Sequence, residues 1–356
     1  MFNKKDDKKD ASLSARTELS ALGEFGLIDH LTKNFAVTGE TTVKGVGDDA
    51  AVIDTKGDLL LLSTDLLIEG VHFDLTYMPL RHLGYKAVVV NVSDIAAMNG
   101  IPRQITVSIA VSNRFPVEAL DELYTGIKLA CEKYKVDLVG GDTSSSTKGL
   151  MLSVTVTGTA KSGEITYRNG AKDGDLLCVT GDLGGAYAGL LLLEREKQVF
   201  RANPNMQPEL DGYEYVLGRQ LKPEARTDLR TLLSGAGVKP TAMIDISDGL
   251  ASEVMHICKQ SHKGCRIYEE KIPLSDETRK LAMEFKIAPS ICALSGGEDY
   301  ELLFTISQAD YEKIRDFPEI SVVGHLTKNE EEKILITSDG KLLELKAQGW
   351  DAMREK

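Results

Sequence analysis

The sequence predicts an α/β protein built from two domains. Chain length is the first observation, because 356 residues exceed the usual size of a single domain. The second is the order of the pattern, in which short apolar or alternating runs that suit strands are separated by amphipathic runs that suit helices. The third is a change of composition over residues 161–175, which are rich in glycine and charge and which we take as the domain boundary.

The first domain is predicted from residue 15 to residue 160, after a charged tail over residues 1–14 that we expect to be disordered. Residues 59–63 are a short aliphatic run, and we expect a buried strand there that presents Thr64 and Asp65 at its end. The other elements expected here are a helix over 82–98, a strand over 104–111, a helix opened by Pro116, a strand over 136–139 broken by Gly140-Gly141, and a strand over 151–159.

The second domain is predicted from residue 161 to residue 356, and it alternates strands with helices. Strands are expected over 176–180 and 242–246, and each leads through a glycine-containing turn into a helix. A further strand is expected over 301–305, followed by a hairpin whose arms are 334–337 and 342–345. No fixed-period repeat is present in the sequence, which argues against a solenoid.

The composition limits the classes of partner and the compartment. A formal net charge of −12 makes the chain a poor partner for nucleic acid or for an anionic membrane. Its five cysteines form no CxxC pair, which is typical of a reduced protein whose cysteines pack in the core. No apolar run reaches transmembrane length, and the start of the chain lacks the apolar segment of a signal peptide. Together these observations predict a cytoplasmic protein.

Aspartates beside Gly, Ser or Thr are the main candidates for chemistry, because the chain has no Walker P-loop, no GxGxxG after a strand, no HExxH and no GxSxG. They form five motifs, Gly47-Asp48-Asp49, Ser63-Thr64-Asp65, Ser93-Asp94, Gly140-Gly141-Asp142-Thr143 and Asp245-Ile246-Ser247-Asp248. Short carboxylates at the ends of strands converge on one cleft in an open α/β sheet, and hard oxygen ligands suit Mg²⁺. Neighbouring glycines let main-chain N–H groups approach a polyphosphate.

Each motif has a plainer interpretation when it is taken alone. Gly-Asp is a common turn sequence, and Ser247-Asp248 suits the N-cap of a helix. Asp94 differs because it lies inside a predicted helix, one turn after Asn91, where aspartate is unfavourable. It must therefore be exposed or have a partner such as a metal ion. Five such motifs in one chain favour the functional interpretation over five independent coincidences.

Four further residues have two interpretations each. Glu298 lies in a glycine loop, either as a plain connection or as a hydrogen-bond acceptor for a ligand. Arg168 is either a solvated arginine between domains or a group that reaches a phosphate or stacks on a base. His72 suits a packed or turn position as well as a ligand contact. Trp350, the only tryptophan, either anchors the C-terminus or stacks on a planar substrate ring.

Taken in order, the motifs resemble those of the thiamine-monophosphate kinase family. The matching runs, from Glu24 to about Trp350, include Gly-Val-Gly-Asp-Asp-Ala-Ala, Ser-Thr-Asp, His-Phe, Asn-Val-Ser-Asp-Ile-Ala-Ala-Met, Gly-Gly-Asp-Thr, Asp-Ile-Ser-Asp-Gly-Leu and Ser-Gly-Gly-Glu-Asp-Tyr-Glu-Leu. Gly-Gly-Glu-Asp-Tyr-Glu and Glu-Phe-Gly-Leu-Ile favour this kinase over the related aminoimidazole ribonucleotide synthetase, selenophosphate synthetase and hydrogenase maturation protein. The first fourteen residues have no counterpart in the family pattern.

The resemblance implies a first domain with a mixed sheet and flanking helices that pairs in a homodimer, a C-terminal α/β domain, and ATP with several Mg²⁺ ions at the cleft. By position, the implied Mg²⁺ ligands are Asp49, Ser63, Thr64, Asp65, Asp94, Asp142, Asp245 and Asp248. The implied contacts to ATP are Tyr124, Gly141, Asp142, Arg168 and Ser247, and those to thiamine monophosphate are His72, Glu298 and Trp350.

The implied reaction transfers the γ-phosphoryl group of ATP to thiamine monophosphate and yields thiamine diphosphate and ADP. The attacking oxygen belongs to an ionised phosphate, so the reaction requires no general base. The main obstacle is repulsion between two polyanions, which Mg²⁺ offsets while aligning donor and acceptor, and we therefore expect direct transfer without a phosphoenzyme. The alternatives are another ATP-using member of the superfamily with a different acid or amide as substrate, a non-catalytic nucleotide-binding or scaffold protein, and a metal-dependent phosphate hydrolase.

Overall fold

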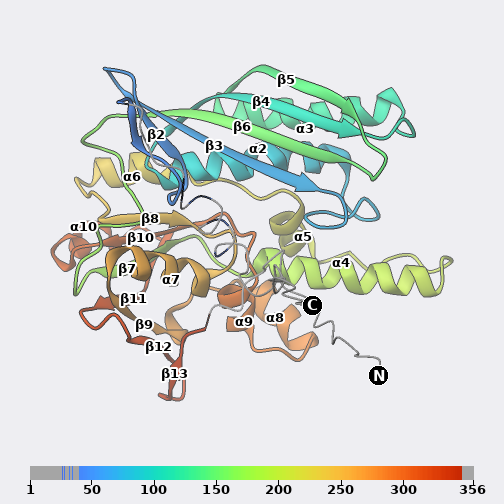
Figure 1. The fold of residues 1–356 in the computed structure, drawn as a ribbon. Helices are drawn as coiled ribbons and strands as arrows, with labels where there is room; N and C mark the ends of the chain where they lie inside the picture. The colour runs from blue at the N-terminus through green and yellow to red at the C-terminus, as the bar shows by residue number, and fades with distance from the viewer. Residues whose placement is uncertain (1–25, 27, 29–31, 33, 35–39, 347–356) are drawn as a thin grey trace, which may run out of the picture. The chain divides into compact units, whose positions relative to one another are not determined.

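The structure, a computed structural model, describes Gly26, Ile28, Thr32, Asn34 and residues 40–346. The tail predicted over residues 1–14 and the predicted substrate contact Trp350 lie outside the described residues. All elements discussed below lie within residues 40–346, which belong to one compact unit. They make up two sheets with helices, so the predicted mixed α/β class is confirmed (Figure 1).

The first sheet has six strands in the order β1-β2-β3-β6-β4-β5. In chain order their bounds are β1 Thr42–Lys44, β2 Ala51–Asp54, β3 Leu59–Ile68, β4 Ile101–Val111, β5 Asp137–Ser145 and β6 Met151–Ala160. All neighbours are antiparallel except β4 and β5, which are parallel, so the sheet is mixed. The single parallel pair is joined through a helix, as parallel connections require.

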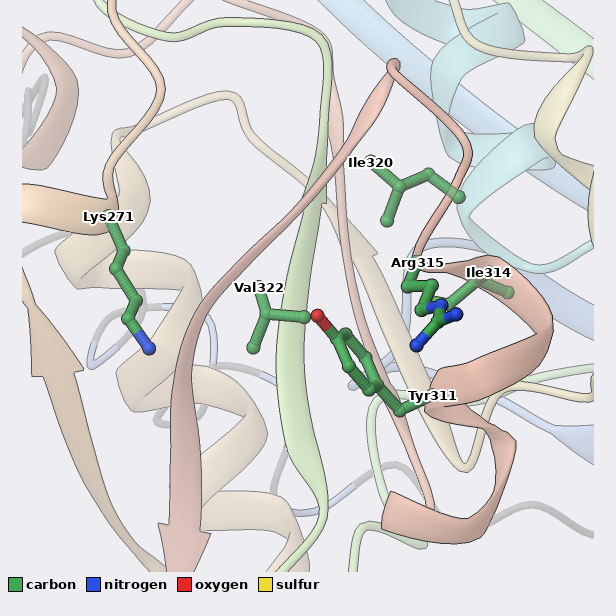
Figure 2. A pocket seen from close by; sticks show the side chains of 6 residues that line it. All are labelled: Lys271, Tyr311, Ile314, Arg315, Ile320 and Val322. Carbon is green, nitrogen blue, oxygen red and sulfur yellow. The ribbon is translucent and has the colours of Figure 1, made fainter.

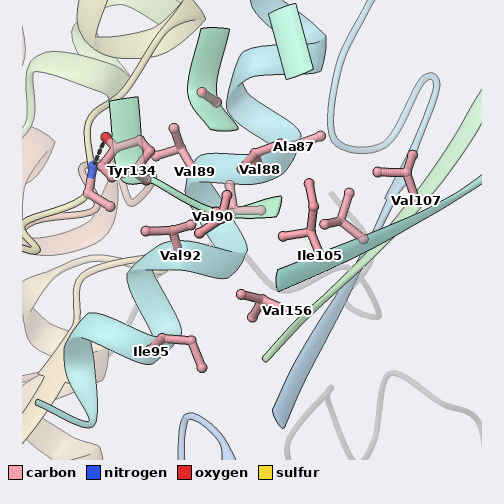
Figure 3. Close-up of a cluster of buried hydrophobic side chains, with 14 of the residues drawn as sticks. Ala87, Val88, Val89, Val90, Val92, Ile95, Ile105, Val107, Tyr134 and Val156 are labelled. Carbon is pink, nitrogen blue, oxygen red and sulfur yellow. Dashed lines mark hydrogen bonds between the residues drawn. The ribbon is translucent and has the colours of Figure 1, made fainter. Parts of the chain in front are cut away.

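Two helices, α2 (Leu80–Ala97) and α3 (Val117–Tyr134), pack together on this sheet. Along β6 every second residue is buried, so one face of the sheet points toward these helices. Figure 3 shows the core that results, with α2 valines facing Ile105 and Val107 of β4 and Val156 of β6. Nearly all of α2 is buried because it contacts β3, β4 and β6 on one side and β8 on the other. Such all-round burial explains why α2 lacks a polar face.

The second sheet has seven strands in the order β13-β12-β9-β11-β7-β10-β8. Its strands are β7 Leu176–Thr180, β8 Ala242–Asp245, β9 Gly264–Tyr268, β10 Leu302–Ile306, β11 Ile320–Thr327, β12 Lys333–Ile336 and β13 Leu342–Glu344. The accompanying helices are α4 Gly185–Ala202, α5 Glu214–Leu221, α6 Leu229–Gly235, α7 Leu250–Ser261, α8 Asp276–Glu284, α9 Pro289–Ser295 and α10 Tyr311–Ile314, with 3-10 turns η2 Glu269–Lys271 and η3 Gln308–Asp310. None of the helices in the described part of the chain combines the length and the apolar character needed to cross a membrane.

Most of the predicted elements are confirmed. The helix expected over 82–98 is α2, and it ends where Asn99 adopts a left-handed conformation with φ of 57°. Pro116 caps α3 as expected, and the strand predicted over 176–180 coincides with β7. The predicted C-terminal hairpin is the antiparallel pair β12–β13.

Two predicted strand ends are wrong. The strand expected to stop at Ser63 continues to Ile68, because β3 keeps an unbroken antiparallel register with β6 over its whole length. The strand expected to break at Gly140-Gly141 continues as β5 to Ser145. A Cβ atom at Gly141 would lie 1.8 Å from the main-chain oxygen of Val107, so the glycine is what allows β5 to approach β4 there.

The close contact of α2 with α3 depends on two glycines. A Cβ atom on Gly126 would lie 1.8 Å from the Arg81 oxygen, and one on Gly84 would lie 1.9 Å from the Leu123 oxygen. We predict that Gly126→Ala lowers the free energy of unfolding by about 3 kcal/mol, since backbone blocks the new methyl group. The matched control is Gly218→Ala on exposed α5, where the methyl group meets nothing within 4 Å. Denaturant unfolding should show that the control stabilises the protein by about 0.5–1 kcal/mol; equal effects of the two substitutions would contradict the packing argument.

Candidate functional site

Three aspartates from distant parts of the chain converge on one point. Asp49, Asp94 and Asp245 each offer a carboxylate oxygen, and these oxygens all lie within 4.8 Å of one another. Asp49 belongs to the turn before β2, Asp94 to α2, and Asp245 to the end of β8. We call these three residues the acidic triad. The sequence motifs predicted that these side chains meet, and the structure brings them together.

Two serines fix the orientation of the triad. Ser63 donates its hydroxyl hydrogen to Asp94 Oδ2 at 2.5 Å, and Ser93 donates to Asp245 Oδ2 at 2.7 Å. Ser93 and Asp94 are adjacent on α2, so neighbouring residues of one helix contact the second and the first sheet respectively. The burial of α2 between the sheets therefore positions the acids.

Arg168 binds Asp49 through two nitrogens of its guanidinium group. Nε donates to Asp49 Oδ2 and Nη2 to Asp49 Oδ1, each at 2.8 Å, and the main-chain N–H of Arg168 donates to Asp48 at 3.1 Å. Burial alone would lower the pKa of Arg168, but the neighbouring Asp49 carboxylate outweighs burial and raises it. A two-point contact of this kind fixes the plane of the carboxylate. Arg168 therefore orients the triad rather than lying solvated between domains.

The electrostatics of the triad favour a bound cation. Burial raises the pKa of Asp94 well above its usual value, and the nearby carboxylates Asp65, Asp245 and Asp49 raise it further. Burial and the Asp49 charge likewise raise the pKa of Asp245 to about 8. Like charges held this close oppose each other's ionisation unless a positive ion offsets them. Clustered carboxylate oxygens are what Mg²⁺ prefers, so the residues present fit that ion.

The Ser63-Thr64-Asp65 motif divides between the two faces of the sheet. Ser63 contacts the triad directly, and Asp65 lies close enough for its charge to raise the pKa of Asp94. The main-chain N–H of Asp65 is held by Asn91 of α2 at 3.1 Å. The Thr64 side chain instead bonds the Val154 oxygen on β6 at 3.1 Å. Side chains alternate along a strand, so the Thr64 hydroxyl is not brought to the triad.

Three residues predicted to contact nucleotide or metal lie elsewhere. Gly141 and Asp142 are exposed on β5, the edge strand, where Asp142 pairs in register with Ser108. Tyr124 is half-buried on α3 and packs against the core of the first sheet. Within the described residues, no hydrogen bond or ion pair joins any of these three to the triad.

The turn after β8 brings Ser247 and Asp248 close to the loop that carries Glu298. The Ser247 main-chain oxygen accepts from the Glu298 N–H at 2.7 Å. Helix α7 begins after Gly249 without a side-chain cap, so the alternative that Ser247-Asp248 forms its N-cap is wrong. The Asp248 N–H donates instead to the buried carboxylate of Glu253 at 2.8 Å. The motif is thus held by α7 and by the glycine loop.

The two predicted substrate contacts that the structure describes, Glu298 and His72, are electrostatic neighbours. Glu298 forms an ion pair with Lys86 at 2.9 Å and accepts from Gln220 Nε2 at 2.7 Å. His72 Nδ1 accepts from the Ile68 N–H at 3.0 Å. Burial lowers the pKa of His72, while the charge of Glu298 opposes that shift. His72 therefore closes the turn after β3 close to Glu298.

Sequence reasoning assigned no role to several residues that hold this site, namely Ser93, Lys86, Gln220 and Glu253. A signal existed for Lys86, which interrupts an otherwise apolar helical run, and for Glu253, which follows Asp248 by five positions. The contact of Gln220 with Glu298 joins α5 to a distant loop and leaves no local pattern.

A separate surface pocket of about 210 Å³ lies beside β11 and α10 (Figure 2). It is lined by Lys271, Tyr311, Ile314, Arg315, Ile320 and Val322. None of the residues predicted to bind metal, nucleotide or substrate lines it, so this pocket does not belong to the candidate site.

Comparisons with known proteins define the class first. Residues 47–160 match the N-terminal domain model of AIR synthase related proteins, and residues 172–336 match the C-terminal domain model of the same proteins. The two matches cover most of the chain, and each contains one of the two sheets almost completely. The chain is thus an AIR synthase related protein.

Full-length relatives narrow the class. The thiamine-monophosphate kinase of Bacillus subtilis is 35% identical over 93% of this chain and 99% of the relative, and that of Aquifex aeolicus is 38% identical over 93% and 98%. The solved structure of AaThiL complexed with AMPPCP and TMP matches with a TM-score of 0.81 at 34% identity, over 96% of this chain and 99% of that one. The chain belongs to the thiamine-monophosphate kinase family, and it is a kinase.

The triad predicts how metal removal and pH affect stability. Asp245 keeps its proton in the folded, metal-free protein up to about pH 8 but loses it near pH 3.8 when unfolded. The folded state then binds more protons between these values, so the stability of the metal-free protein falls as pH rises through this range. We predict that Mg²⁺ raises the melting temperature by on the order of 3 °C more at pH 8 than at pH 5.

The measurement is thermal unfolding with EDTA or MgCl₂ at both pH values. Asp245→Asn removes one titrating group and should reduce the pH dependence of the metal-free protein, while Asp94 retains its raised pKa. A Mg²⁺ effect of equal size at pH 5 and pH 8 would contradict the assignment.

Proposed function

We propose that this enzyme phosphorylates thiamine monophosphate to thiamine diphosphate with ATP, by direct in-line transfer that requires several Mg²⁺ ions. The observation that carries the proposal is the acidic triad, held at one point by residues from both sheets and from α2. The family relatives support the substrate pair, since a similar solved protein is described as complexed with AMPPCP and TMP.

The residues proposed to hold Mg²⁺ are the triad with Ser63, Asp65 and Asp248, together with Thr64 and Asp142, whose side chains the single chain does not bring to the triad. When bound, the ions would neutralise the phosphate oxygens of donor and acceptor. The chain's own part is orientation, because Ser63 and Ser93 fix two of the carboxylates and Arg168 fixes the third. An ionised phosphate needs no base to attack, which agrees with a site built from acids and hydroxyl groups.

For the nucleotide we propose Tyr124, Gly141, Asp142, Arg168 and Ser247, and for thiamine monophosphate His72, Glu298 and Trp350. Arg168 and Ser247 border the triad through Asp49 and the turn after Asp245. The main chain of Glu298 is hydrogen-bonded to Ser247. Thiamine monophosphate bound by Glu298 would therefore lie beside the proposed metal ligands.

We also propose a homodimer that covers β5. All nine residues of this edge strand are exposed, including Leu138 at 45% and Val139 at 62%. Exposed edges with apolar side chains pair readily with other chains. Gly141 and Asp142 lie on this strand, so a second copy would enclose the part of the site that the single chain leaves open. The proposed compartment is the cytoplasm, and the proposed domains are residues 15–160 and 161–356.

The dimer predicts a simple change of mass. Val139→Glu places a charge in the proposed interface without disturbing the fold, because the side chain is exposed in the single chain. Light scattering after size exclusion should give twice the chain mass for the unmodified protein and a shift toward the single chain for the variant. Met283→Glu, which places the same charge at another exposed apolar residue, on α8, serves as the control. A single-chain mass for both proteins would rule out the dimer.

The assay that tests the function combines the protein with ATP, MgCl₂ and thiamine monophosphate and measures thiamine diphosphate. Inversion of configuration at the transferred phosphorus supports direct transfer, whereas retention or a trapped phosphoenzyme contradicts it. Release of phosphate without thiamine diphosphate would favour a hydrolase. Transfer to another acid or amide would favour a different member of the superfamily, and nucleotide binding without turnover a non-catalytic role.

Asp94→Asn and Asp245→Asn are the sharpest variants of the triad. Each keeps the volume of the side chain but removes a charge needed to hold a cation, so we expect a loss of kcat of about 100-fold or more. Melting temperatures should stay close to that of the unmodified protein, because crowded carboxylates repel one another in the metal-free state. Asp58→Asn, on the exposed turn between β2 and β3, is the matched control and should keep full activity. Near-normal turnover of either variant at saturating Mg²⁺ would remove that residue from the ligand set.

A further inference from the structure

Lys86 is a buried lysine in the middle of α2. Its exposure is 1%, and it is among the largest fully buried side chains of the described chain. The residues around it on α2 are apolar and equally buried. Burying an ammonium group is costly unless it is paired and hydrogen-bonded, so its partners indicate why it is there.

The partners of Lys86 form a clamp on Glu298. Lys86 Nζ lies 2.9 Å from Glu298 Oε1 and donates to the Gln220 main-chain oxygen at 3.1 Å. Gln220 Nε2 donates to the other carboxylate oxygen, Glu298 Oε2, at 2.7 Å. Each oxygen of Glu298 therefore receives one donor, and the two donors come from α2 and α5.

The burial of the clamp is one-sided. The side chain of Lys86 is 1% exposed, while that of its partner Glu298 is 29% exposed. A carboxylate has about four lone-pair positions, of which the clamp uses two. No hydrogen bond from the described residues occupies the remaining positions, so they can accept from a ligand that approaches from the exposed side.

The main chain at Glu298 is held in an uncommon conformation. Its φ of 60° lies in the left-handed region, which costs a non-glycine residue of order 1 kcal/mol or more. Gly297 before it also has a positive φ, and a Cβ atom there would lie 2.4 Å from the Ser247 oxygen. Asp299 after it is buried and accepts from the Gly184 N–H at 2.6 Å. Contacts on both sides thus fix where the Glu298 side chain begins.

A purely structural ion pair would not need this arrangement. Buried pairs add little net stability compared with apolar residues of the same size. A pair between two interior residues would also leave no oxygen facing outward. In the clamp, a buried lysine instead orients a carboxylate that is partly exposed. This carboxylate belongs to a residue whose main chain is hydrogen-bonded to the turn that follows Asp245 and carries Asp248.

We propose that Lys86 and Gln220 are positioning residues that hold the Glu298 carboxylate oriented to accept hydrogen bonds from the organic part of the acceptor substrate. A carboxylate repels phosphate, so it faces the ring portion of thiamine monophosphate rather than its phosphate or the nucleotide. This inference rests on the proposed function, because it specifies how the same site selects its acceptor.

The test is Lys86→Met, which keeps the length of the side chain and removes its charge. We expect KM for thiamine monophosphate to rise about 10-fold or more, the effect of a lost hydrogen bond to a charged group, while KM for ATP stays within about 2-fold. Glu298→Gln should give the same selective rise. The double variant should be no worse than either single one, because both act through one contact.

Two further variants keep the result clear. Gln220→Met removes the second donor and also an amide oxygen that is buried without a partner, so it should fold well and still raise KM for thiamine monophosphate. The matched control is Lys133→Met, which removes a lysine of α3 from a half-exposed ion pair with Glu224 and should change neither KM.

Unchanged KM values, or equal changes for both substrates, would overturn the proposal. A lowered melting temperature in the same variants would then show that the ion pair is structural. Absence of thiamine diphosphate formation by the unmodified enzyme would overturn the proposed function itself. The two failures are distinguishable, because the first requires an active unmodified enzyme.

Discussion

The mutual repulsion of three buried carboxylates is the constraint on which the rest of the site depends. Asp49, Asp94 and Asp245 would separate if their main chains were free, since the charges of Asp49 and Asp245 raise the pKa of Asp94 and the charge of Asp49 raises that of Asp245. They stay together because α2 is enclosed by apolar contacts with both sheets. The apolar packing therefore sustains an electrostatic strain that protonation or a bound cation would relieve.

Helix α2 explains how one element serves two sheets. Its valines face the first sheet, and Ser93 reaches Asp245 on the second. A helix so enclosed needs neighbours that come unusually close, which Gly84 and Gly126 allow at the crossing with α3. Lys86 belongs to the same helix, so α2 also links the triad to the Glu298 loop.

The sequence predicted the convergence of the triad because its members follow regular signals. Asp245 ends a short apolar strand, and Asp94 is an unfavourable residue inside a helix. Local patterns could not predict which face of a strand a residue occupies. Ser63 reaches Asp94 and Thr64 does not, because β3 continues past the point where its aliphatic run weakens.

Local sequence patterns also could not predict the long-range polar contacts of the site. Lys86 looks like an exception within an apolar helix until Glu298 and Gln220 are placed beside it, and all three come from separate elements. The resemblance to a kinase family predicted that Glu298 matters but not what holds it. Tertiary packing alone decides such pairs, since nothing in the spacing of these residues indicates contact.

Arg168 shows how the site can accept a cation without rearranging its acids. Its two contacts occupy one lone-pair position on each oxygen of Asp49, which leaves further acceptor positions on the same carboxylate. A guanidinium group that held Asp94 or Asp245 would instead have satisfied the charge at the centre of the triad. Within the triad, Arg168 forms hydrogen bonds to Asp49 and orients that acid. Its charge also acts on Asp245, yet the pKa of Asp245 remains raised. The repulsion that remains is what the proposed Mg²⁺ would offset.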